Sequence, residues 1–349
     1  KENLSLKLLR DAYPVGDEQV LVYEVLGRTV PEGGIPLDIG SVVLNVETLL
    51  NIAAACQDQP VITTYVTITG EVEEPLTLGV PVGTPIASVL DLAGGVAIPD
   101  YGVIEGGPMT GRIVPQDAIE VGKAAVKKTT KGVIVLPQDH WLIKQPGLSL
   151  GSILQRAQSA CCQCRLCTDL CPRHLLGHDI NPHLVLNAVN HGQINNTEAY
   201  TQSFLCSDCG VCELYACPVE LSPRRMYQAV KAELVRHGLK NPHKRQAVPK
   251  TIWEGRQIPA SKLISRLGLE RYNCPAPLGK VEFSPREVVM VLKQHIGVPA
   301  VPKVKVGDRV KLGQPIASPS PGKLGAVLHA SIAGRVREVN EEAIIIAGE

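Results

Sequence analysis

Aromatic residues are scarce in this sequence of 349 residues, where Phe, Trp and Tyr together make up 3%. An excess of charge of one sign is also lacking, because 35 Lys and Arg balance 34 Asp and Glu for a net charge of +1. This balance argues against a nucleic-acid-binding protein, which needs a basic surface. No apolar run approaches the ~20 residues needed to cross a bilayer, so we expect no transmembrane segment.

Two further features are missing from the sequence. The pattern GxGGxG, whose bare backbone N–H groups can cradle a phosphate, occurs nowhere in it. A signal peptide is also absent, and the chain begins with Lys1 instead of Met. We therefore expect a cytoplasmic protein from a reducing compartment, of which this sequence is a processed or partial form.

Glycine, proline and cysteine are plentiful by contrast. The 32 Gly and 27 Pro predict many turns and short strands, and the length allows two to four domains. Eight of the 11 cysteines form two ordered quartets, each followed directly by proline. The quartets are Cys161, Cys164, Cys167, Cys171 and Cys206, Cys209, Cys212, Cys217.

The first quartet has the spacing C-x-x-C-x-x-C-x-x-x-C-P, which binds cubane iron-sulfur clusters in bacterial ferredoxins. Three thiolates of such a run reach one cube, while the fourth lies too far along the chain and ligates the other cube. We therefore predict two [4Fe-4S] clusters. The predicted ligand sets are Cys161, Cys164, Cys167 with Cys217, and Cys206, Cys209, Cys212 with Cys171.

Zinc ligation and disulfide formation are alternative roles for these thiols. Four thiolates could hold zinc, although zinc leaves the remaining thiolates of each quartet without a role. Disulfides are disfavoured, because the thiols lie too close along the chain for unstrained bridges. Cys162 could replace Cys161 as the ligand, and the second quartet has four residues, not three, before its last cysteine. Cys56 and Cys274 lie outside the quartets and are predicted to be structural thiols.

The first 58 residues predict a capped helix after residue 17, a buried strand at 42–45 and a second helix at 46–55. The motifs GDE at 16–18, GR at 27–28 and NVET at 45–48 resemble the flavin- and NADH-binding fold of the complex I flavoprotein subunit. The resemblance implies an FMN site and NADH as electron donor. The implied FMN-binding residues are Gly16, Asp17, Glu18, Asn45, Glu47 and Thr48.

The residues alone do not decide whether this site exists, because Asp17 and Glu18 are equally well explained as acids at a helix N-terminus. The family's glycine-rich phosphate loop is absent, and we expect it upstream of Lys1. FMN is therefore expected in the full-length protein.

The rest of the sequence predicts an α+β multidomain protein. Residues 59–137 read as strand, turn, strand and helix, which resembles the SLBB β-grasp domain. Helices between and after the quartets predict a helical dicluster ferredoxin domain at 150–247. This domain includes a basic helix at 223–236, whose charged face is either solvated or docks an acidic partner. A linker at 248–279 precedes short strands at 280–349, which resemble the barrel-sandwich hybrid of the Rnf complex C subunit.

The barrel at the C-terminus and the run CCQCRLCTDLCPRHL at 161–175 resemble the cobalamin reductases of propanediol-utilising microcompartments. The resemblance implies electron transfer from NADH to FMN, then to two [4Fe-4S] clusters and to cobalamin. It also implies a cobalamin adenosyltransferase and a microcompartment shell protein as partners, and a place inside a bacterial microcompartment. The alternative is an Rnf-type electron-carrier subunit that passes electrons to a partner protein. No catalytic residue is identified.

Overall fold

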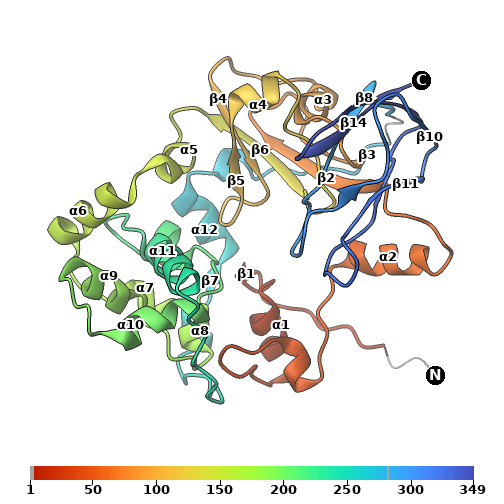
Figure 1. The fold of residues 1–349 in the computed structure, drawn as a ribbon. Helices are drawn as coiled ribbons and strands as arrows, with labels where there is room; N and C mark the ends of the chain where they lie inside the picture. The colour runs from red at the N-terminus through yellow and green to blue at the C-terminus, as the bar shows by residue number, and fades with distance from the viewer. Residues whose placement is uncertain (1–3, 281–282) are drawn as a thin grey trace. The chain divides into compact units, whose positions relative to one another are not determined.

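The structure is a computed structural model that describes residues 4–280 and 283–349 (Figure 1). The chain divides into two units, each built from two separate segments. Residues 1–43 and 147–271 form the first unit, and residues 44–146 and 272–349 form the second. The division falls inside the segment 1–58, so the predicted flavin-binding segment contributes to both units.

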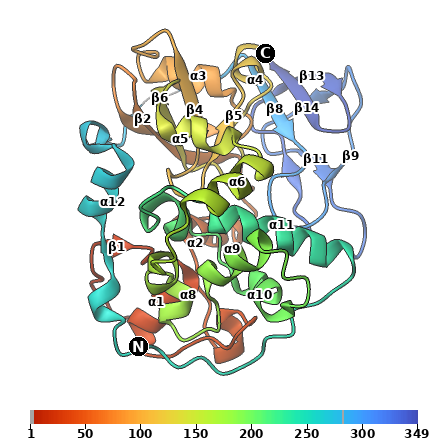
Figure 2. The same cartoon turned by 90° about the vertical axis from the view of Figure 1, so that its left-hand side faces the viewer.

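The first unit is mainly helical, as predicted for the segment that holds the cysteines (Figure 2). A helix predicted between the quartets and the helix predicted at 223–236 are confirmed as α9 and α11. The helices of this unit are α1 (Glu18–Leu26), α6 (Leu150–Ala160), α7 (Leu166–Asp169), α8 (Pro172–Leu175), α9 (Pro182–Asn190), α10 (Thr197–Thr201), α11 (Pro223–Arg236) and α12 (Ala260–Leu267). The short turns are η1 (Pro36–Ile39), η3 (Gln202–Leu205), η4 (Val211–Tyr215) and η5 (Glu254–Arg256).

Apolar side chains of α6, α9 and α11 form the core around the cysteine loops. Ile153, Leu186 and Met226 belong to this core, and so do the thiols Cys171 and Cys217. Figure 2 shows α9 and α11 side by side, in agreement with their contacts. Burial of these helix faces therefore also places two of the eight quartet thiols.

The N-terminal segment is packed onto the same unit. Strand β1 (Ala12–Tyr13) pairs antiparallel with β7 (Ile258–Pro259). Helix α1 ends at Gly27, which adopts a left-handed φ of 66°. Tyr23 of α1 meets Trp253 edge to face, with the ring centroids 5.3 Å apart. Helix α1 and the segment after the quartets thus share one core.

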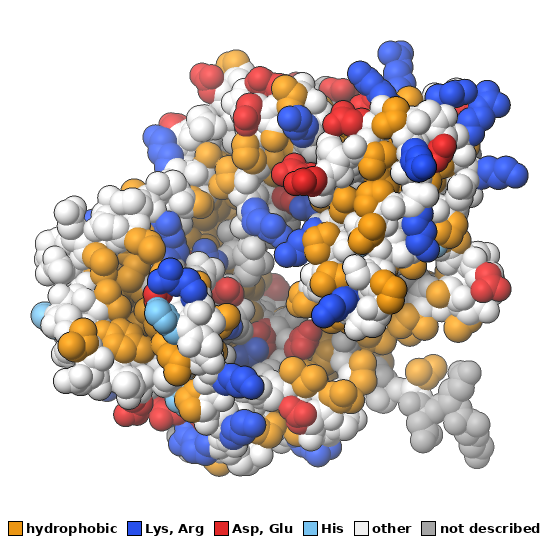
Figure 3. Space-filling view, viewed as in Figure 1, with side chains coloured by type: hydrophobic (Ala, Val, Ile, Leu, Met, Phe, Trp, Pro, Cys, Tyr) orange, Lys and Arg blue, Asp and Glu red, His pale blue; other side chains and the backbone are white. Residues whose placement is uncertain are grey.

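The prediction of a strand at 42–45 is wrong. Those residues are irregular and largely exposed, and no described strand pairs with them. An apolar run needs a neighbouring strand or a helix to be buried, and nothing described supplies one here. The following helix α2 (Val46–Ala55) forms as predicted, yet none of its residues is buried. Figure 3 shows hydrophobic side chains over α2, where Leu50 is 61% exposed.

The second unit contains a five-stranded sheet of order β3-β2-β6-β4-β5. Strands β2 and β6 are parallel, and the other neighbours are antiparallel. The strands are β2 (Thr63–Gly70), β3 (Leu76–Pro81), β4 (Tyr101–Glu105), β5 (Arg112–Val114) and β6 (Gly132–Pro137). Helix α3 (Ile86–Leu92) covers the sheet, and its residue Val89 belongs to the same core as Val66 and Ile68. The predicted strand, turn, strand and helix are therefore present; α4 (Gln116–Glu120) and α5 (Trp141–Lys144) complete this part.

Residues 283–349 form two small sheets of order β10-β13-β14-β8 and β12-β11-β9. The strands are β8 (Glu287–Val291), β9 (Val301–Pro302), β10 (Arg309–Val310), β11 (Pro315–Ser318), β12 (Leu328–His329), β13 (Gly334–Val339) and β14 (Ala343–Gly348). Val288, Ile316 and Ile344 belong to one core, so the two sheets pack face to face. Within the described residues they form a sandwich and not a closed barrel.

Candidate metal centres

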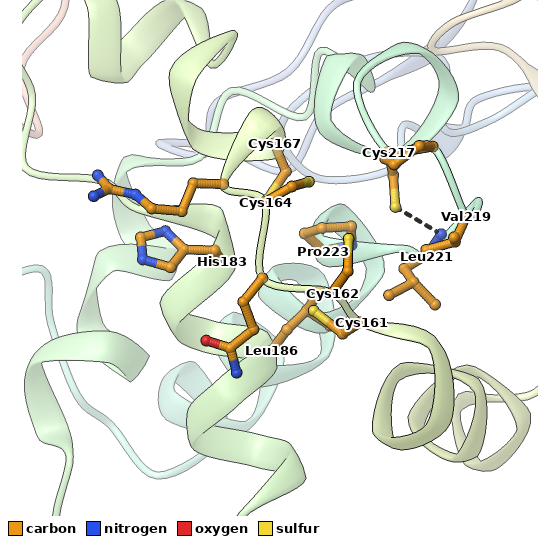
Figure 4. Close-up of a pocket in the computed structure, with 13 residues that line it drawn as sticks. Cys161, Cys162, Cys164, Cys167, His183, Leu186, Cys217, Val219, Leu221 and Pro223 are labelled. Carbon is orange, nitrogen blue, oxygen red and sulfur yellow. Dashed lines mark hydrogen bonds between the residues drawn. The ribbon is translucent and has the colours of Figure 1, made fainter.

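Thiols from both quartets line one cavity in the first unit (Figure 4). Three of its thiols, Cys161, Cys164 and Cys167, come from the first quartet, and Cys217 comes from the second. Cys162 also lines this cavity. Leu186 and His183 of α9 form part of the wall, so the apolar core closes one side of the cavity.

A second cavity has the complementary composition. Cys206, Cys209 and Cys212 line it together with Cys171 of the first quartet. Each cavity thus takes three thiols from one loop and the fourth from the other loop, which is the crossed arrangement predicted from the spacing. This geometry supports the eight thiols as ligands of two clusters.

The two loops repeat one backbone conformation. Gln163 and Asp208, which precede the middle cysteine, have φ of 55° and 61°, and Arg165 and Gly210, which follow it, have φ of 63° and 80°. A left-handed φ is uncommon outside glycine, so its recurrence at matched positions is a strong sign of equivalence. The repeat places Cys161 opposite Cys206, and Cys162 opposite Ser207, which is not a thiol.

The extra residue of the second quartet is also accommodated by backbone conformation. After its third cysteine the first loop continues as the short α-helix α7 (Leu166–Asp169). The second loop continues as the π-helical turn η4 (Val211–Tyr215). A π-turn is wider than an α-turn, because its hydrogen bonds span one more residue. Cys217 therefore reaches the first cavity although four residues separate it from Cys212.

The thiols surround each cavity and do not converge on a point. In the two described ranges, no three His, Cys, Asp or Glu side chains gather closely enough for one metal ion. A tetrahedral zinc site would bring its four sulfurs to about 4 Å from one another, since each Zn–S bond is about 2.3 Å. All eight thiols are free. The donor set fits a cluster with an iron at each thiol better than one ion or a disulfide.

The buried thiols of the two cavities can ionise only if a positive charge lies beside them. Burial raises the pKa of Cys167 to about 12, and the charge of Cys217 is the next cause. Burial also raises the pKa of Cys206 to about 12. Thiols this buried ionise only beside a metal, which removes the proton outright. The backbone N–H groups of Leu221 and Asp208 donate to the sulfurs of Cys217 and Cys206 at 3.3 and 3.4 Å.

The two cavities differ in exposure. Cys162 and Cys164 at the first cavity are exposed. At the second cavity Cys171 and Cys212 are buried, and the other two thiols are half-buried. The first cavity is therefore the more accessible one.

An ion pair and a hydrogen bond that sequence reasoning missed connect the N-terminal segment to residues at or next to the second cavity. Arg173 follows the Cys171-Pro172 pair and binds both carboxylate oxygens of Asp17, at 2.7 and 3.1 Å. The hydroxyl of Tyr13 donates to the carbonyl of Cys209 at 2.6 Å. Contacts over such sequence separations leave no local pattern, which is why the sequence did not reveal them.

One prediction for the basic helix needs correction. Arg224, predicted to lie on a solvated or docking face of α11, lines the second cavity and pairs with the buried Glu213 at 2.7 Å. A buried carboxylate needs a cation, and Arg224 is held inward for that reason. The cysteines outside the quartets also differ from expectation, because Cys56 and Cys274 are exposed.

The predicted flavin residues fall in two separate units. Gly16, Asp17 and Glu18 belong to the first unit, where Asp17 accepts the N–H groups of Gln19 and Val20 as the N-cap of α1. Its second role, the pair with Arg173, leaves little of this carboxylate for a ligand. Gly16 and Glu18 are exposed.

Asn45, Glu47 and Thr48 belong to the second unit. Asn45 is the N-cap of α2, and its side chain accepts the N–H of Glu47 at 2.9 Å. Glu47 pairs with Lys131 at 2.8 Å and accepts the hydroxyl of Thr64. Thr48 is exposed in the first turn of the same helix. The six residues alone do not make a phosphate cradle, because the polar groups of Asp17, Asn45 and Glu47 are already engaged within the chain.

Two curated proteins are similar to nearly the whole chain. The cobalamin reductase PduS of Citrobacter freundii is 41% identical over 98% of this chain and 75% of its own length. The cobalamin reductase PduS of Salmonella typhimurium is 42% identical over 99% of this chain and 75% of its own length.

The chain belongs to the PduS cobalamin reductase family.

Four domain models match along this PduS family member. Residues 1–54 match the Nuo51 FMN-binding domain, and residues 65–113 match the SLBB domain. Residues 160–222 match the 4Fe-4S dicluster domain, and residues 276–349 match the RnfC barrel sandwich hybrid domain. The predicted fold class is therefore confirmed in all four parts. The matches also confirm FMN and two [4Fe-4S] clusters as the cofactors of this kind of chain.

The predicted relation of this PduS family member to Rnf complexes is confirmed as well. The C subunit of the Na⁺-translocating ferredoxin:NAD⁺ oxidoreductase complex of Acetobacterium woodii is 33% identical over 55% of this chain and 40% of its own length. Among the helices of the described residues, none combines the length and apolar character that a membrane span requires.

Proposed function

We propose that this chain passes single electrons through two [4Fe-4S] clusters to the cobalt of cobalamin. The observation that carries the proposal is the pair of crossed four-thiol cavities in a chain that belongs to the PduS cobalamin reductase family. The proposed ligands are Cys161, Cys164, Cys167 and Cys217 for the first cluster, and Cys171, Cys206, Cys209 and Cys212 for the second. Cubane clusters of this kind are one-electron relays whose potential depends on burial and on hydrogen bonds to sulfur.

The two cavities suggest a direction of transfer. Tyr13 and Asp17 attach the N-terminal segment beside the second cavity, and this segment lies in the FMN-binding match. The first cavity carries the exposed thiol Cys164. We therefore assign the second cavity to electron entry and the first to electron exit, because a bulky acceptor can approach only an exposed site.

The donor and the partners belong to the same proposal. NADH is the proposed donor, and FMN is its proposed first acceptor in the full-length protein. Gly16, Asp17, Glu18, Asn45, Glu47 and Thr48 stay the residues that the resemblance implies for FMN, and other groups would have to bind its phosphate. A cobalamin adenosyltransferase is the proposed consumer of the reduced cobalamin. The family name of the relatives supports a place within a bacterial microcompartment, where a shell protein is a further partner. The proposed domains are the partial FMN- and NADH-binding domain at 1–58, the SLBB domain at 59–137, the dicluster domain at 150–247, the linker at 248–279 and the barrel-sandwich hybrid at 280–349.

Anaerobic reduction of cob(III)alamin, followed by its visible spectrum, tests the proposal. The FMN-loaded full-length protein is given NADH and compared with Cys167→Ser and Cys212→Ser, one thiol from each cavity. Cys274→Ser is the matched control, since this thiol is exposed and lies outside both cavities. We expect the control to reduce cobalamin at the parent rate and both cavity variants to lose nearly all turnover. Parent turnover in the two cavity variants would refute the clusters as the route.

An Rnf-type electron carrier is the second candidate function. The match of residues 276–349 to the RnfC barrel sandwich hybrid domain favours it. In that case NADH would still bleach the clusters, but cobalamin would stay oxidised until a protein acceptor is added. The same experiment therefore separates the two functions.

A further inference from the structure

Helix α11 brings a buried tyrosine to the wall of the second cavity. Tyr227 is 1% exposed and belongs to the core that also contains Cys171 and Cys217. Its ring lines the second cavity together with Cys171, Cys206 and Cys212. Neither the spacing of the cysteines nor the family resemblance gives this residue a role.

The hydroxyl of Tyr227 has no hydrogen-bond partner among the described residues. A buried hydroxyl without a partner is costly, and native proteins rarely leave one. Two other polar side chains line this cavity: Arg224 is a donor paired with Glu213, and Ser207 makes no hydrogen bond to the Tyr227 hydroxyl. The partner of the Tyr227 hydroxyl must therefore accept a hydrogen bond and must lie inside the cavity.

Thiols share the cavity wall with this hydroxyl. Cys171, Cys206, Cys209 and Cys212 line the same cavity as Tyr227. When these thiols ligate a cluster, their sulfurs are anionic acceptors. A tyrosine hydroxyl has an ordinary pKa of about 10, so it keeps its proton at neutral pH and can donate a hydrogen bond to such a sulfur.

We propose that the hydroxyl of Tyr227 donates a hydrogen bond to a sulfur of the cluster held in the second cavity and thereby raises its reduction potential. A donor to sulfur stabilises the more negative, reduced cluster, which makes the cluster easier to reduce. Tyr227 is in this sense a tuning residue and ligates no metal. The inference rests on the [4Fe-4S] assignment of the proposed function and is independent of cobalamin.

Redox titration of the full-length protein, followed by the EPR signals of the two reduced clusters, tests the proposal. No cobalamin is present, so failure of cobalamin reduction cannot affect the outcome. Tyr227→Phe removes only the hydroxyl. We expect the midpoint potential of one cluster to become more negative and that of the other to move less. Tyr200→Phe is the matched control, because Tyr200 on α10 lines neither cavity, and it should leave both midpoints in place.

A second readout distinguishes tuning from simple packing. In the parent protein we expect a proton that exchanges in D₂O to couple to the second cluster in electron–nuclear double resonance spectra, and Tyr227→Phe should lose that coupling. Unchanged midpoints together with an unchanged coupling in Tyr227→Phe would overturn the proposal.

A third measurement applies if Tyr227→Phe fails to hold iron. Fluorinated tyrosine, a stronger donor, is then incorporated in a Tyr13→Phe background, since the Tyr13 hydroxyl donates to the carbonyl of Cys209. The proposal expects one midpoint to shift in the opposite direction, toward positive potential. Absence of any shift would overturn it.

Discussion

Left-handed residues flank the middle cysteine of both loops, and they decide where the thiols point. Gln163 and Arg165 in the first loop match Asp208 and Gly210 in the second. Because backbone dihedrals fix the direction of each Cα–Cβ bond, the first cysteine of each loop is defined by its distance from this feature. This feature matches Cys161 with the ligand Cys206, whereas the neighbouring Cys162 matches Ser207.

The choice between these neighbours is testable by substitution. We expect Cys161→Ser to lose about half of the bound iron and the EPR signal of one cluster, because each cubane needs four ligands. Cys162→Ser is the matched variant and should keep all the iron. Iron content per chain and EPR spectra after reduction measure both. Loss of iron from Cys162→Ser alone would reverse the assignment.

The same scale shows why the sequence predicted the thiols but not their surroundings. The spacing of the eight cysteines predicts the crossed ligand sets, because the spacing within each quartet is a local property of the chain. Tyr227 and Arg224 reach the second cavity through tertiary packing, and nothing in the neighbouring residues indicates it. Helical periodicity places Arg224 on α11 but does not say which neighbour the helix will meet.

At the scale of elements, the N-terminal segment is held to the cluster-bearing helices by a buried carboxylate. Glu32 is 4% exposed and accepts the N–H of Asp179 at 2.6 Å. The guanidinium of Arg245 donates to the same oxygen at 3.0 Å. Burial alone would raise the pKa of Glu32, but these donors outweigh it and lower the pKa below its ordinary value. One carboxylate thus joins three distant loops.

This contact predicts a specific dependence of stability on pH. Since the folded pKa of Glu32 is depressed, its contribution is full above the unfolded value of about 4.3 and is lost as pH falls toward the folded value. We expect Glu32→Gln to lower the free energy of unfolding by about 2 kcal/mol at pH 7, the strength of a charge-assisted hydrogen bond. The difference from the parent should shrink below about pH 4.5. Urea unfolding at several pH values measures it.

The exposed Glu198→Gln on α10 is the control for this prediction and should follow the parent at every pH. His178 adds a second dependence on pH. Burial, with the charge of Arg173 as the next cause, lowers the pKa of His178 to about 4, and the charge of Glu32 opposes this shift. The parent and both variants should therefore also lose stability below about pH 6.5, and Glu32→Gln should lose no less than the parent from this cause. A parallel offset between parent and Glu32→Gln down to pH 3.5 would contradict the role of Glu32.

Two helices of the first unit were predicted correctly, whereas the strand at 42–45 was not, and the difference has a physical reason. Helices α9 and α11 were expected at nearly their observed bounds, because proline and glycine mark their ends and an apolar stripe marks their buried faces. The strand expected at 42–45 did not form, although its residues are apolar. A strand depends on hydrogen bonds to another segment, so apolar residues alone cannot predict it.

At the scale of the whole molecule, all eight quartet thiols belong to the first unit, and the second unit has cores of its own. Cluster ligation should therefore stabilise the first unit selectively, since metal-binding free energy becomes folding free energy where the ligands lie. The sheet around Val66 and the sandwich around Ile344 need no metal to bury their apolar residues.

Removal of iron tests this difference. We expect the chelated, reduced protein to be cleaved by protease within residues 147–271, while residues 59–137 and 283–349 stay protected. Mass spectrometry of the limited digest measures the cleavage sites. Untreated Cys171→Ser/Cys217→Ser, which removes one ligand from each cavity, is the matched control and should give the same fragments. Even digestion of both units would show that the clusters stabilise the chain as a whole.

Because the two ligand sets are crossed, each cluster closes a loop of the chain, and one loop lies inside the other. The link between Cys171 and Cys206 closes a shorter loop that lies wholly inside the loop closed by Cys167 and Cys217. The entropy lost on closing a loop grows with its length, and an inner link already shortens the outer loop. The order of assembly follows: the second cavity should acquire its cluster first, and the exposed cavity should be completed last.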